Sequence, residues 1–107
     1  MKTNAPFQLT LQATEDLDAI WWNIAEENRD AAERVESEIL AACRRLANYP
    51  RVGTRRRDIT MLPVRFWTIT KFPNYVIVYR PETTPLQVVA ILHGRRDLKE
   101  VLERRPL

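Results

Sequence analysis

The sequence is poor in the residues from which many enzymatic sites are built. Among its 107 residues are one cysteine, one histidine, one serine and two glycines. The single cysteine, Cys43, excludes an internal disulfide and is typical of a reducing compartment. Cys43 and His93 lie fifty residues apart and offer no metal-ligand spacing, so we expect neither a metal nor a cofactor. The isolated Gly53 and Gly94 do not make a glycine-rich phosphate loop.

Long hydrophobic runs and a serine nucleophile are missing as well. The only serine, Ser37, lies within a predicted helix without an elbow motif, which argues against a Ser-His-Asp triad. No apolar run approaches the roughly 20 residues of a membrane span, and the N-terminal residues do not resemble a signal peptide. We therefore expect a cytoplasmic protein without a membrane partner, made of one domain over residues 1–107.

Positive charge is abundant and unevenly placed. Residues 1–48 hold five Lys and Arg against nine Asp and Glu, a net charge of −4, whereas residues 49–107 hold twelve against five, a net charge of +7. Fourteen of the seventeen cations are arginine, which favours bidentate contacts to carboxylate or phosphate. Such a basic half is typical of a protein with an acidic partner, either nucleic acid or an acidic protein segment. A solvated basic surface without a partner is the alternative.

Hydrophobic periodicity predicts one strand and two helices in the first half. Residues 7–11 alternate apolar and polar, as a half-buried strand does. Thr14 and the two acids after it then read as a helix cap with a favourable first turn. The helix is indicated by apolar residues at i, i+3, i+4 and i+7, namely Leu17, Ile20, Trp21 and Ile24.

The second predicted helix follows after a short link. Asp30 to Glu33 resembles a capping box, and an apolar seam continues to Leu46 with the spacing of a helix that packs on another helix. Pro50 ends this helix, since proline restricts the residue before it. The two helices are therefore predicted to form an antiparallel hairpin.

Three strands and a short helix are predicted in the second half. The strands cover residues 64–70, 75–80 and 86–92, and their short connections indicate an antiparallel meander. A last helix is expected within residues 97–105. The order β-α-α-β-β-β-α predicts a two-layer α+β domain, with the helical hairpin on one face of the sheet.

The last predicted strand runs directly into a basic corner, residues 93–97. Gly94 permits a sharp turn there, which would present cationic side chains at the end of a rigid strand. Together with cations elsewhere in the second half, this corner forms the candidate site. The set is Arg55, Arg56, Arg57, Arg65, Arg80, His93, Arg95 and Arg96.

These basic residues have a functional and a structural interpretation. We expect several of them to converge on one face of the sheet, where they could hold phosphates and where His93 could act as an acid or base. In the structural alternative the stems of Arg65 and Arg80 cover the core. Asp58 and Asp97 then pair with neighbouring arginines.

The adjacent Trp21 and Trp22 cannot both face the core, because neighbouring helical residues point about 100° apart. Trp21 lies on the apolar stripe of the first helix and Trp22 lies beside it. Trp22 is either a partly covered boundary residue or an anchor for a protein partner, since exposed tryptophan is enriched in binding hot spots.

The order and spacing of several short segments resemble the ParE/RelE superfamily, the toxins of bacterial type II toxin–antitoxin systems that are often labelled plasmid stabilisation proteins. The resemblance begins near Phe7 and continues to the C-terminus. The matching segments are Ala13 to Trp21, Tyr49-Pro50 with Gly53, Val64-Arg65-Phe66, Tyr75 to Arg80, and Val89 through the His93 corner to Leu98. The resemblance implies the same α+β fold as the one expected above.

The resemblance also implies one of two activities. RelE-like toxins cut mRNA in the ribosomal A site, whereas ParE-like toxins share the fold and poison DNA gyrase. Arg96 stands where RelE-like toxins carry a key arginine. Val76 stands in place of another of their arginines, Leu102 in place of their C-terminal tyrosine, and residues 66–69 contain none of their catalytic lysines.

These departures favour the ParE branch, a gyrase inhibitor rather than an enzyme, and imply no catalytic residue. Cutting RNA requires a base, an acid and charge stabilisation at phosphate, and His93 is the one obvious proton carrier. Under the RelE-like alternative, a ribosome-dependent endoribonuclease, the catalytic set would be Arg65, His93 and Arg96.

The resemblance further implies a protein partner. Such toxins are neutralised by a small antitoxin, usually encoded alongside, whose tail wraps the toxin, so a hetero-oligomer is expected. The basic half would attract an acidic tail. Trp22 and the eight basic residues are the expected partner contacts, with apolar anchors of the tail along the hairpin near Trp22 or a strand added to a sheet edge.

Overall fold

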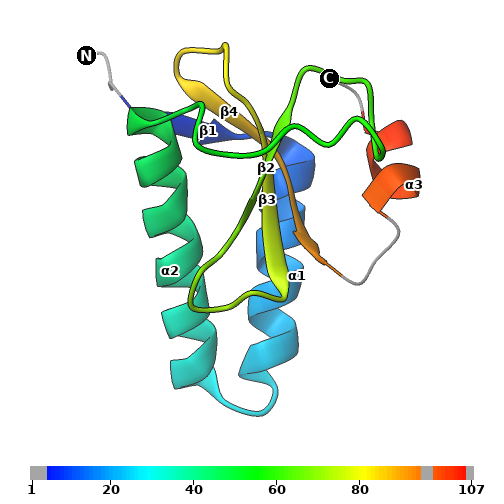
Figure 1. Cartoon of the computed structure of the whole chain (residues 1–107). Coiled ribbons are helices and arrows are strands. Elements are labelled where there is room, and N and C mark those ends of the chain that lie inside the picture. The colour runs from blue at the N-terminus through cyan, green and yellow to red at the C-terminus, as the bar shows by residue number, and fades with distance from the viewer. Residues whose placement is uncertain (1–4, 95–97, 106–107) are drawn as a thin grey trace.

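The structure is a computed structural model that describes residues 5–94 and 98–105. Its elements are β1 (Phe7–Leu9), α1 (Leu11–Ala25), α2 (Arg29–Asn48), β2 (Arg65–Thr68), β3 (Tyr75–Arg80), β4 (Leu86–His93) and α3 (Leu98–Glu103), as Figure 1 shows. The predicted α+β class and element order are confirmed. None of the described helices is long and apolar enough to cross a membrane.

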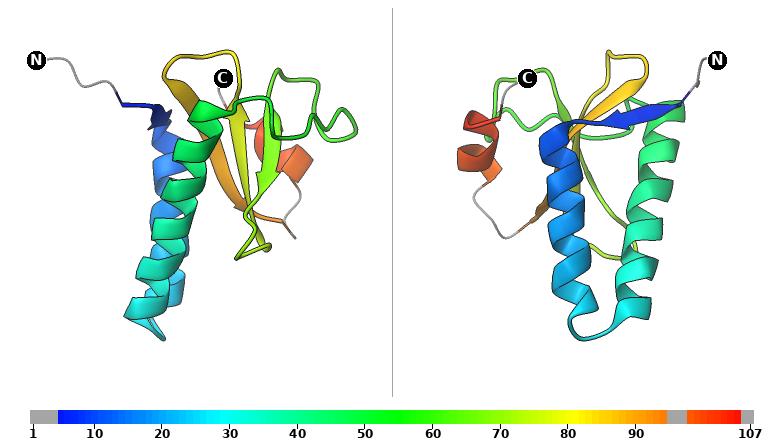
Figure 2. Two further views of the ribbon diagram at one scale, coloured as in Figure 1. Left: turned by 60° about the vertical axis from the view of Figure 1, so that its left-hand side comes forward. Right: turned by 180° about the vertical axis from the view of Figure 1, so that it is seen from behind.

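One four-stranded sheet has the order β1-β4-β3-β2. The last three strands form the predicted antiparallel meander, and β1 pairs in parallel with β4, from Phe7 opposite Leu86 to Leu9 opposite Val88. The α1–α2 hairpin covers one face of the sheet and α3 lies on the other, as the turned views of Figure 2 show. The sheet is therefore apolar on both faces.

Two hydrophobic clusters fill these layers. The hairpin cluster joins Leu17, Ile39 and Leu46 of the helices to Ile77 and Ile91 of the sheet. The second cluster joins the opposite side chains of β2, β3 and β4 to α3, whose Leu98, Val101 and Leu102 face inward. A register shift in the β3–β4 pairing leaves Val89 as an extra residue, so that Val89 and Ala90 both join the second cluster.

The helix starts differ from the predicted ones. Thr10, not Thr14, caps α1, because the Thr10 hydroxyl accepts a hydrogen bond from the Ala13 N–H at 3.1 Å. Thr10 also donates its own N–H to the Val88 carbonyl, so this single residue links the end of β1 to the start of α1. Leu11, predicted as part of the strand, is consequently an exposed residue of the first helical turn.

The predicted capping box at Asp30 is also wrong. Asn28 caps α2, with its side-chain oxygen 3.0 Å from the Ala31 N–H, and Asp30 lies within the first turn. Both caps are residue types that favour this position. Among the strands, β2 is shorter than the predicted segment 64–70, and β4 extends to His93.

A partly buried ion pair joins the end of the described chain to α1. The Arg105 guanidinium holds both Asp16 carboxylate oxygens at 2.8 Å, and its Nη1 also donates to the Val89 carbonyl at 3.1 Å. Asp16 in turn accepts the Ile91 N–H at 3.0 Å. The pair thus satisfies backbone groups of β4 beyond the end of β1, where no strand of the described residues continues the ladder.

Cys43 is fully buried in the hairpin cluster, and this burial raises the pKa of its thiol to about 12. The thiolate is the reactive form, so we expect Cys43 to react with a disulfide reagent at pH 8 only when the protein unfolds. Labelling should be slow in buffer and complete within the mixing time in concentrated urea. Rapid stoichiometric labelling of the native protein would contradict this.

Candidate functional site

Arg65 is bound to the loop that follows α2. Its Nη1 donates to the Gly53 carbonyl at 2.7 Å and to the Arg51 carbonyl at 3.2 Å. Arg65 lies opposite Tyr79 in the β2–β3 ladder, on the hairpin side of the sheet. The guanidinium therefore fastens a loop rather than standing free for a ligand.

Tyr79 fastens the same loop from beneath. Its hydroxyl donates to the Pro50 carbonyl at 2.7 Å and accepts the Gly53 N–H at 2.9 Å. Burial raises the pKa of this phenol, so the donor form persists at neutral pH. The sequence predicts only that Tyr79 lies in the strand 75–80, and no local pattern indicates that its hydroxyl would bind a loop 26 residues away.

Arg65 and Arg80 do not share a face of the sheet, contrary to expectation. Arg80 follows Tyr79 in β3 and therefore points to the α3 side. Its Nη1 lies 3.2 Å from the side-chain oxygen of Gln87, the residue opposite it in β4. The sequence predicts that neighbouring strands present these arginines on one face, but successive side chains of a strand alternate between the faces and so separate them.

The basic loop, residues 55–57, lies outside the sheet. Arg56 forms two hydrogen bonds with Asp58, at 3.0 and 2.7 Å, which lower the pKa of that carboxyl. This is the expected pairing of Asp58 with a neighbouring arginine. Arg55 and Arg57 are exposed, and neither forms an ion pair with any described residue.

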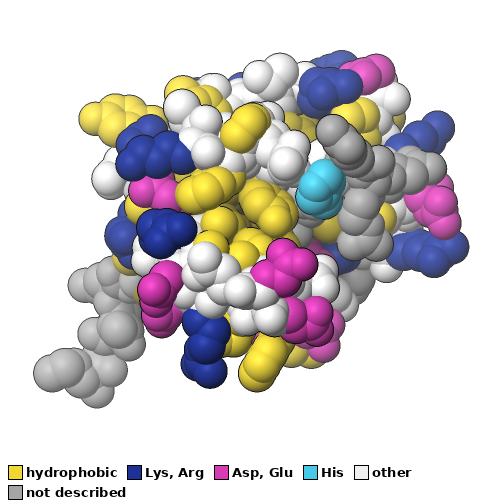
Figure 3. Space-filling model, turned by 90° about the horizontal axis from the view of Figure 1, so that it is seen from below, with side chains coloured by type: hydrophobic (Ala, Val, Ile, Leu, Met, Phe, Trp, Pro, Cys, Tyr) yellow, Lys and Arg dark blue, Asp and Glu magenta, His cyan; other side chains and the backbone are white. Residues whose placement is uncertain are grey.

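His93 ends β4 at a cavity that carboxylate side chains of α1 also line. Its ring packs edge-on against Tyr75, with centroids 5.7 Å apart. Both rings line a cavity of about 250 Å³ together with Glu15, Asp16 and Ile20 of α1. Figure 3 shows His93 at the border of a hydrophobic patch whose rim carries acidic side chains.

The cations of the alternative catalytic set are not assembled. His93 lies opposite Tyr75 and Arg65 lies opposite Tyr79, at the two ends of β3. Four residues of a strand separate two such positions by roughly 13 Å. Arg95 and Arg96, and Asp97 with its expected arginine partner, lie outside the described residues. Among the described residues, no acid, base and phosphate-binding cation converge on one point.

Trp22 is an exposed hydrophobic side chain near the end of α1, with 66% of its surface accessible. It packs edge-on against Trp21 at 5.1 Å between ring centroids, and the Arg29 guanidinium lies 5.4 Å from the Trp21 ring centre. Trp22 is therefore not a covered boundary residue. Its ring is held at the surface by its neighbours.

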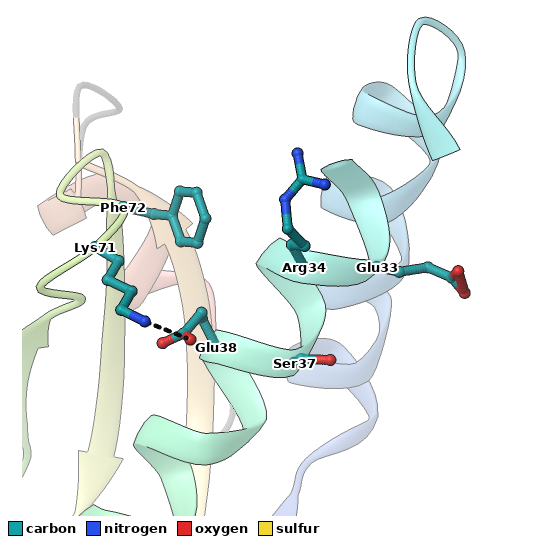
Figure 4. A pocket seen from close by; sticks show the side chains of 6 residues that line it. All are labelled: Glu33, Arg34, Ser37, Glu38, Lys71 and Phe72. Atoms are coloured by element: carbon teal, nitrogen blue, oxygen red, sulfur yellow. Dashed lines mark hydrogen bonds and ion pairs between the residues drawn. The ribbon is translucent and has the colours of Figure 1, made fainter. Parts of the chain in front are cut away.

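A groove between α2 and β2 was not indicated by the sequence. Two adjoining cavities of about 330 and 190 Å³ share Glu38 and Lys71, which form an ion pair at 3.4 Å. Figure 4 shows the Phe72 ring and Arg34 on opposite sides of the larger cavity. Trp67 and Arg45 line the smaller one. We call this surface the α2–β2 groove.

The chain is similar to proteins of known family and structure. A family model described as "ParE toxin of type II toxin-antitoxin system, parDE" matches residues 7–98. Nine chains of solved structures match the chain. One, titled "Chromosomal ParDE TA system from P. aeruginosa", has a TM-score of 0.66 and 21% sequence identity over 81% of this chain and 92% of its own, a likeness of fold. No curated protein matches the chain.

Proposed function

Because the chain belongs to the family of ParE toxins of type II toxin–antitoxin systems, we propose that it inhibits DNA gyrase in the cytoplasm and is neutralised by a cognate antitoxin. The observation that carries this proposal is the separation of its basic residues. Arg65 binds a loop, Arg80 lies on the other face of the sheet, and His93 lies at the opposite end of β3 from Arg65. Such a surface suits contacts with proteins, which require no assembled acid and base.

A RelE-like endoribonuclease is the second candidate. Its one supporting feature is Arg96, which lies outside the described residues. Cleavage of RNA needs a base and an acid within hydrogen-bond reach of the reacting atoms, and His93 and Arg65 stand at opposite ends of β3. The described residues therefore favour gyrase inhibition.

A supercoiling assay with purified gyrase and relaxed plasmid tests the proposal. We expect the chain to block supercoiling and cleaved plasmid to accumulate, because gyrase is trapped on DNA. Adding the protein encoded alongside in excess should restore supercoiling. Unimpaired supercoiling by the folded chain, with cleavage of mRNA on ribosomes that fails in Arg96→Ala, would instead establish the second candidate.

Trp22 and Arg57 are proposed as contacts for a protein partner, since both are exposed. Truncating a binding hot spot costs at least roughly 2 kcal/mol, so Trp22→Ala with Arg57→Ala should weaken binding about thirtyfold. The melting temperature should not change. Titration calorimetry with antitoxin and with gyrase, measured separately, assigns the contact to one partner.

Leu11→Ala is the control, because Leu11 is similarly exposed at the other end of α1. Unchanged affinity for both partners would remove these residues from the interface.

A further inference from the structure

The connection between α2 and β2 is long for so small a domain. It runs over residues 49–64 and contains neither a helix nor a strand, apart from one bridge between Thr54 and Phe66. Loops longer than roughly 12–15 residues without secondary structure are usually either functional or disordered. The contacts of this loop distinguish between the two.

Hydrogen bonds and apolar packing fix the loop in one conformation. The sheet holds its first part through the hydrogen bonds to the loop backbone described above. In its second part, the Ile59 and Thr60 N–H groups both donate to the Arg56 carbonyl at 3.0 Å. Ile59 and Leu62 pack against the cluster on the α3 side of the sheet. A loop that is ordered before binding loses little conformational entropy when a partner docks.

The second part of the loop presents both positive charge and an apolar side chain to solvent. The left view of Figure 2 shows the loop, in green, projecting on the side of the sheet away from the hairpin. Arg55 and Arg57 are exposed and form no ion pair with any described residue. Met61 is 73% exposed. Arginine and methionine are both enriched in protein interfaces. We call Arg55, Arg57 and Met61 the loop surface.

A cavity of about 370 Å³ lies beside the loop. Arg56 of the loop lines it together with Phe66 of β2, Asn74 of the β2–β3 turn, Val76 of β3 and Leu98 of α3. The cavity is therefore on the α3 side of the sheet, where Phe66, Val76 and Leu98 offer apolar contacts to a side chain that enters it. The projecting loop and the neighbouring cavity together give this face a relief that a folded partner can match.

The shape and charge of this face indicate the chemistry of the partner. A rigid projecting loop fits a concave surface of a folded protein, whereas an extended tail is bound in a groove or at a sheet edge. Two arginines without a counter-charge are complementary to carboxylates. The exposed Met61 favours a protein over nucleic acid, because contacts to nucleic acid are made mainly to phosphates.

We infer that the loop surface docks on an acidic and partly apolar surface of gyrase. Met61 packs against apolar side chains of gyrase, Arg55 and Arg57 pair with its carboxylates, and one of its apolar side chains enters the cavity beside Phe66. The inference rests on the proposed function, since gyrase is the partner. It extends that function by naming the surface that contacts gyrase and the chemistry of the surface that it meets.

The first test changes the loop surface and measures binding to gyrase in the absence of DNA. The probe is purified gyrase, and titration calorimetry gives its affinity for each variant. Met61→Ser and Arg55→Glu should each weaken binding at least about tenfold, as expected for contacts near the centre of an interface. Both variants should melt at the temperature of the unchanged chain, because both residues are exposed.

Each of these variants has a matched control. Leu11→Ser is the control for Met61→Ser, because Leu11 is 71% exposed on α1. Arg44→Glu is the control for Arg55→Glu, because it changes the net charge equally at an exposed position of α2. Both controls should change the affinity for gyrase less than about threefold. Equal losses in the loop variants and their controls would overturn the inference.

The second test fills the cavity. Asn74 lines it and is exposed, so the larger side chain of Asn74→Trp would occupy the space without entering the core. We expect this variant to bind gyrase at least about tenfold more weakly. Asn74→Ala leaves the cavity open and should bind like the unchanged chain. Equal affinities of the two variants would remove the cavity from the interface.

The outcomes separate this inference from the proposed function. If the unchanged chain and the loop variants inhibit supercoiling equally, the loop surface is wrong and gyrase inhibition holds. If the loop variants lose affinity for the antitoxin and not for gyrase, the surface belongs to the other partner and the inference is overturned. Binding of duplex DNA without gyrase that Arg55→Glu abolishes would assign the surface to nucleic acid. If the unchanged chain neither binds gyrase nor inhibits it, both the inference and the proposed function fail.

Discussion

Replacing Asp16 by alanine is expected to lower the free energy of unfolding by about 3 kcal/mol, the lower end of the usual cost of breaking a buried ion pair, because this pair is largely but not fully buried. Only 12% of the Asp16 side chain and 13% of that of Arg105 are exposed. The variant would leave the Arg105 cation without its counter-charge. It would also leave the Ile91 N–H without its acceptor.

The loss would be a large share of stability, because small domains unfold with only about 5–15 kcal/mol. Urea titration followed by circular dichroism measures it directly. A surface pair at the C-terminal end of α3, Arg104 with Glu100, provides the control: its partners are 78% and 56% exposed, and Arg104→Ala should cost about 0.5 kcal/mol or less. Similar midpoints for Asp16→Ala and Arg104→Ala would show that the Asp16–Arg105 pair contributes no more than a surface pair.

Gly53→Ala is expected to destabilise the fold by about 2–4 kcal/mol, through overpacking and lost hydrogen bonds. A Cβ at Gly53 would stand 2.5 Å from the Tyr79 hydroxyl and 3.0 Å from the Phe66 carbonyl. None of the described glycines has a positive φ. Glycine is therefore required at residue 53 because there is no room for a Cβ, and not because the backbone adopts a positive φ.

Gly94 is the matched control. A Cβ there would meet its nearest neighbours, the Asn74 carbonyl and a Val76 methyl, at 3.5 Å, which is an ordinary contact. Gly94→Ala should therefore change stability by less than about 1 kcal/mol. The sequence indicates that Gly94 permits a sharp turn, and Gly94 does lie in a turn, but without a positive φ that would favour glycine.

Tyr79→Phe tests the mechanism behind the Gly53 prediction. Alone it should cost about 1–3 kcal/mol, because the Gly53 N–H and the Pro50 carbonyl lose their partner. In that background Gly53→Ala should cost less than in the unchanged chain, since the closest clash is gone. Thermal melts of the unchanged chain, the two single variants and the double variant measure this coupling. Additive losses of stability would refute the steric explanation.

The raised pKa of Tyr79 adds a pH dependence. The folded state favours the neutral phenol, so its contribution is complete below the unfolded pKa of about 10 and is lost as the pH rises through the folded pKa. The unchanged chain should therefore lose more stability than Tyr79→Phe on passing from pH 9 to pH 11. Equal losses of stability in the two proteins would show that groups other than Tyr79 cause the alkaline transition.

The sequence by itself determined the α+β class, the element order, the antiparallel meander and the helical hairpin. Hydrophobic periodicity decides these features, because a helix or strand must bury its apolar side. The seam from Ala32 to Leu46 and the apolar run of β4 leave few other arrangements. The same local patterns misplaced both helix starts, since threonine and acidic residues offer more than one capping position. Pairing of Thr10 with Val88 selected the actual start of α1.

Only the tertiary structure decided which polar side chains meet. Arg105 reaches Asp16 across 89 residues of sequence, and Tyr79 reaches the loop after α2. Arg65 and Arg80 lie on opposite faces of the sheet because successive side chains of a strand alternate between the faces. The α2–β2 groove forms because two elements that are distant in sequence lie close together in the fold. Long polar side chains bind whatever donor or acceptor the packed backbone brings near them, because buried polar groups must be satisfied. That proximity follows from the packing of the whole chain, so the local spacing of residues along the sequence does not predict it.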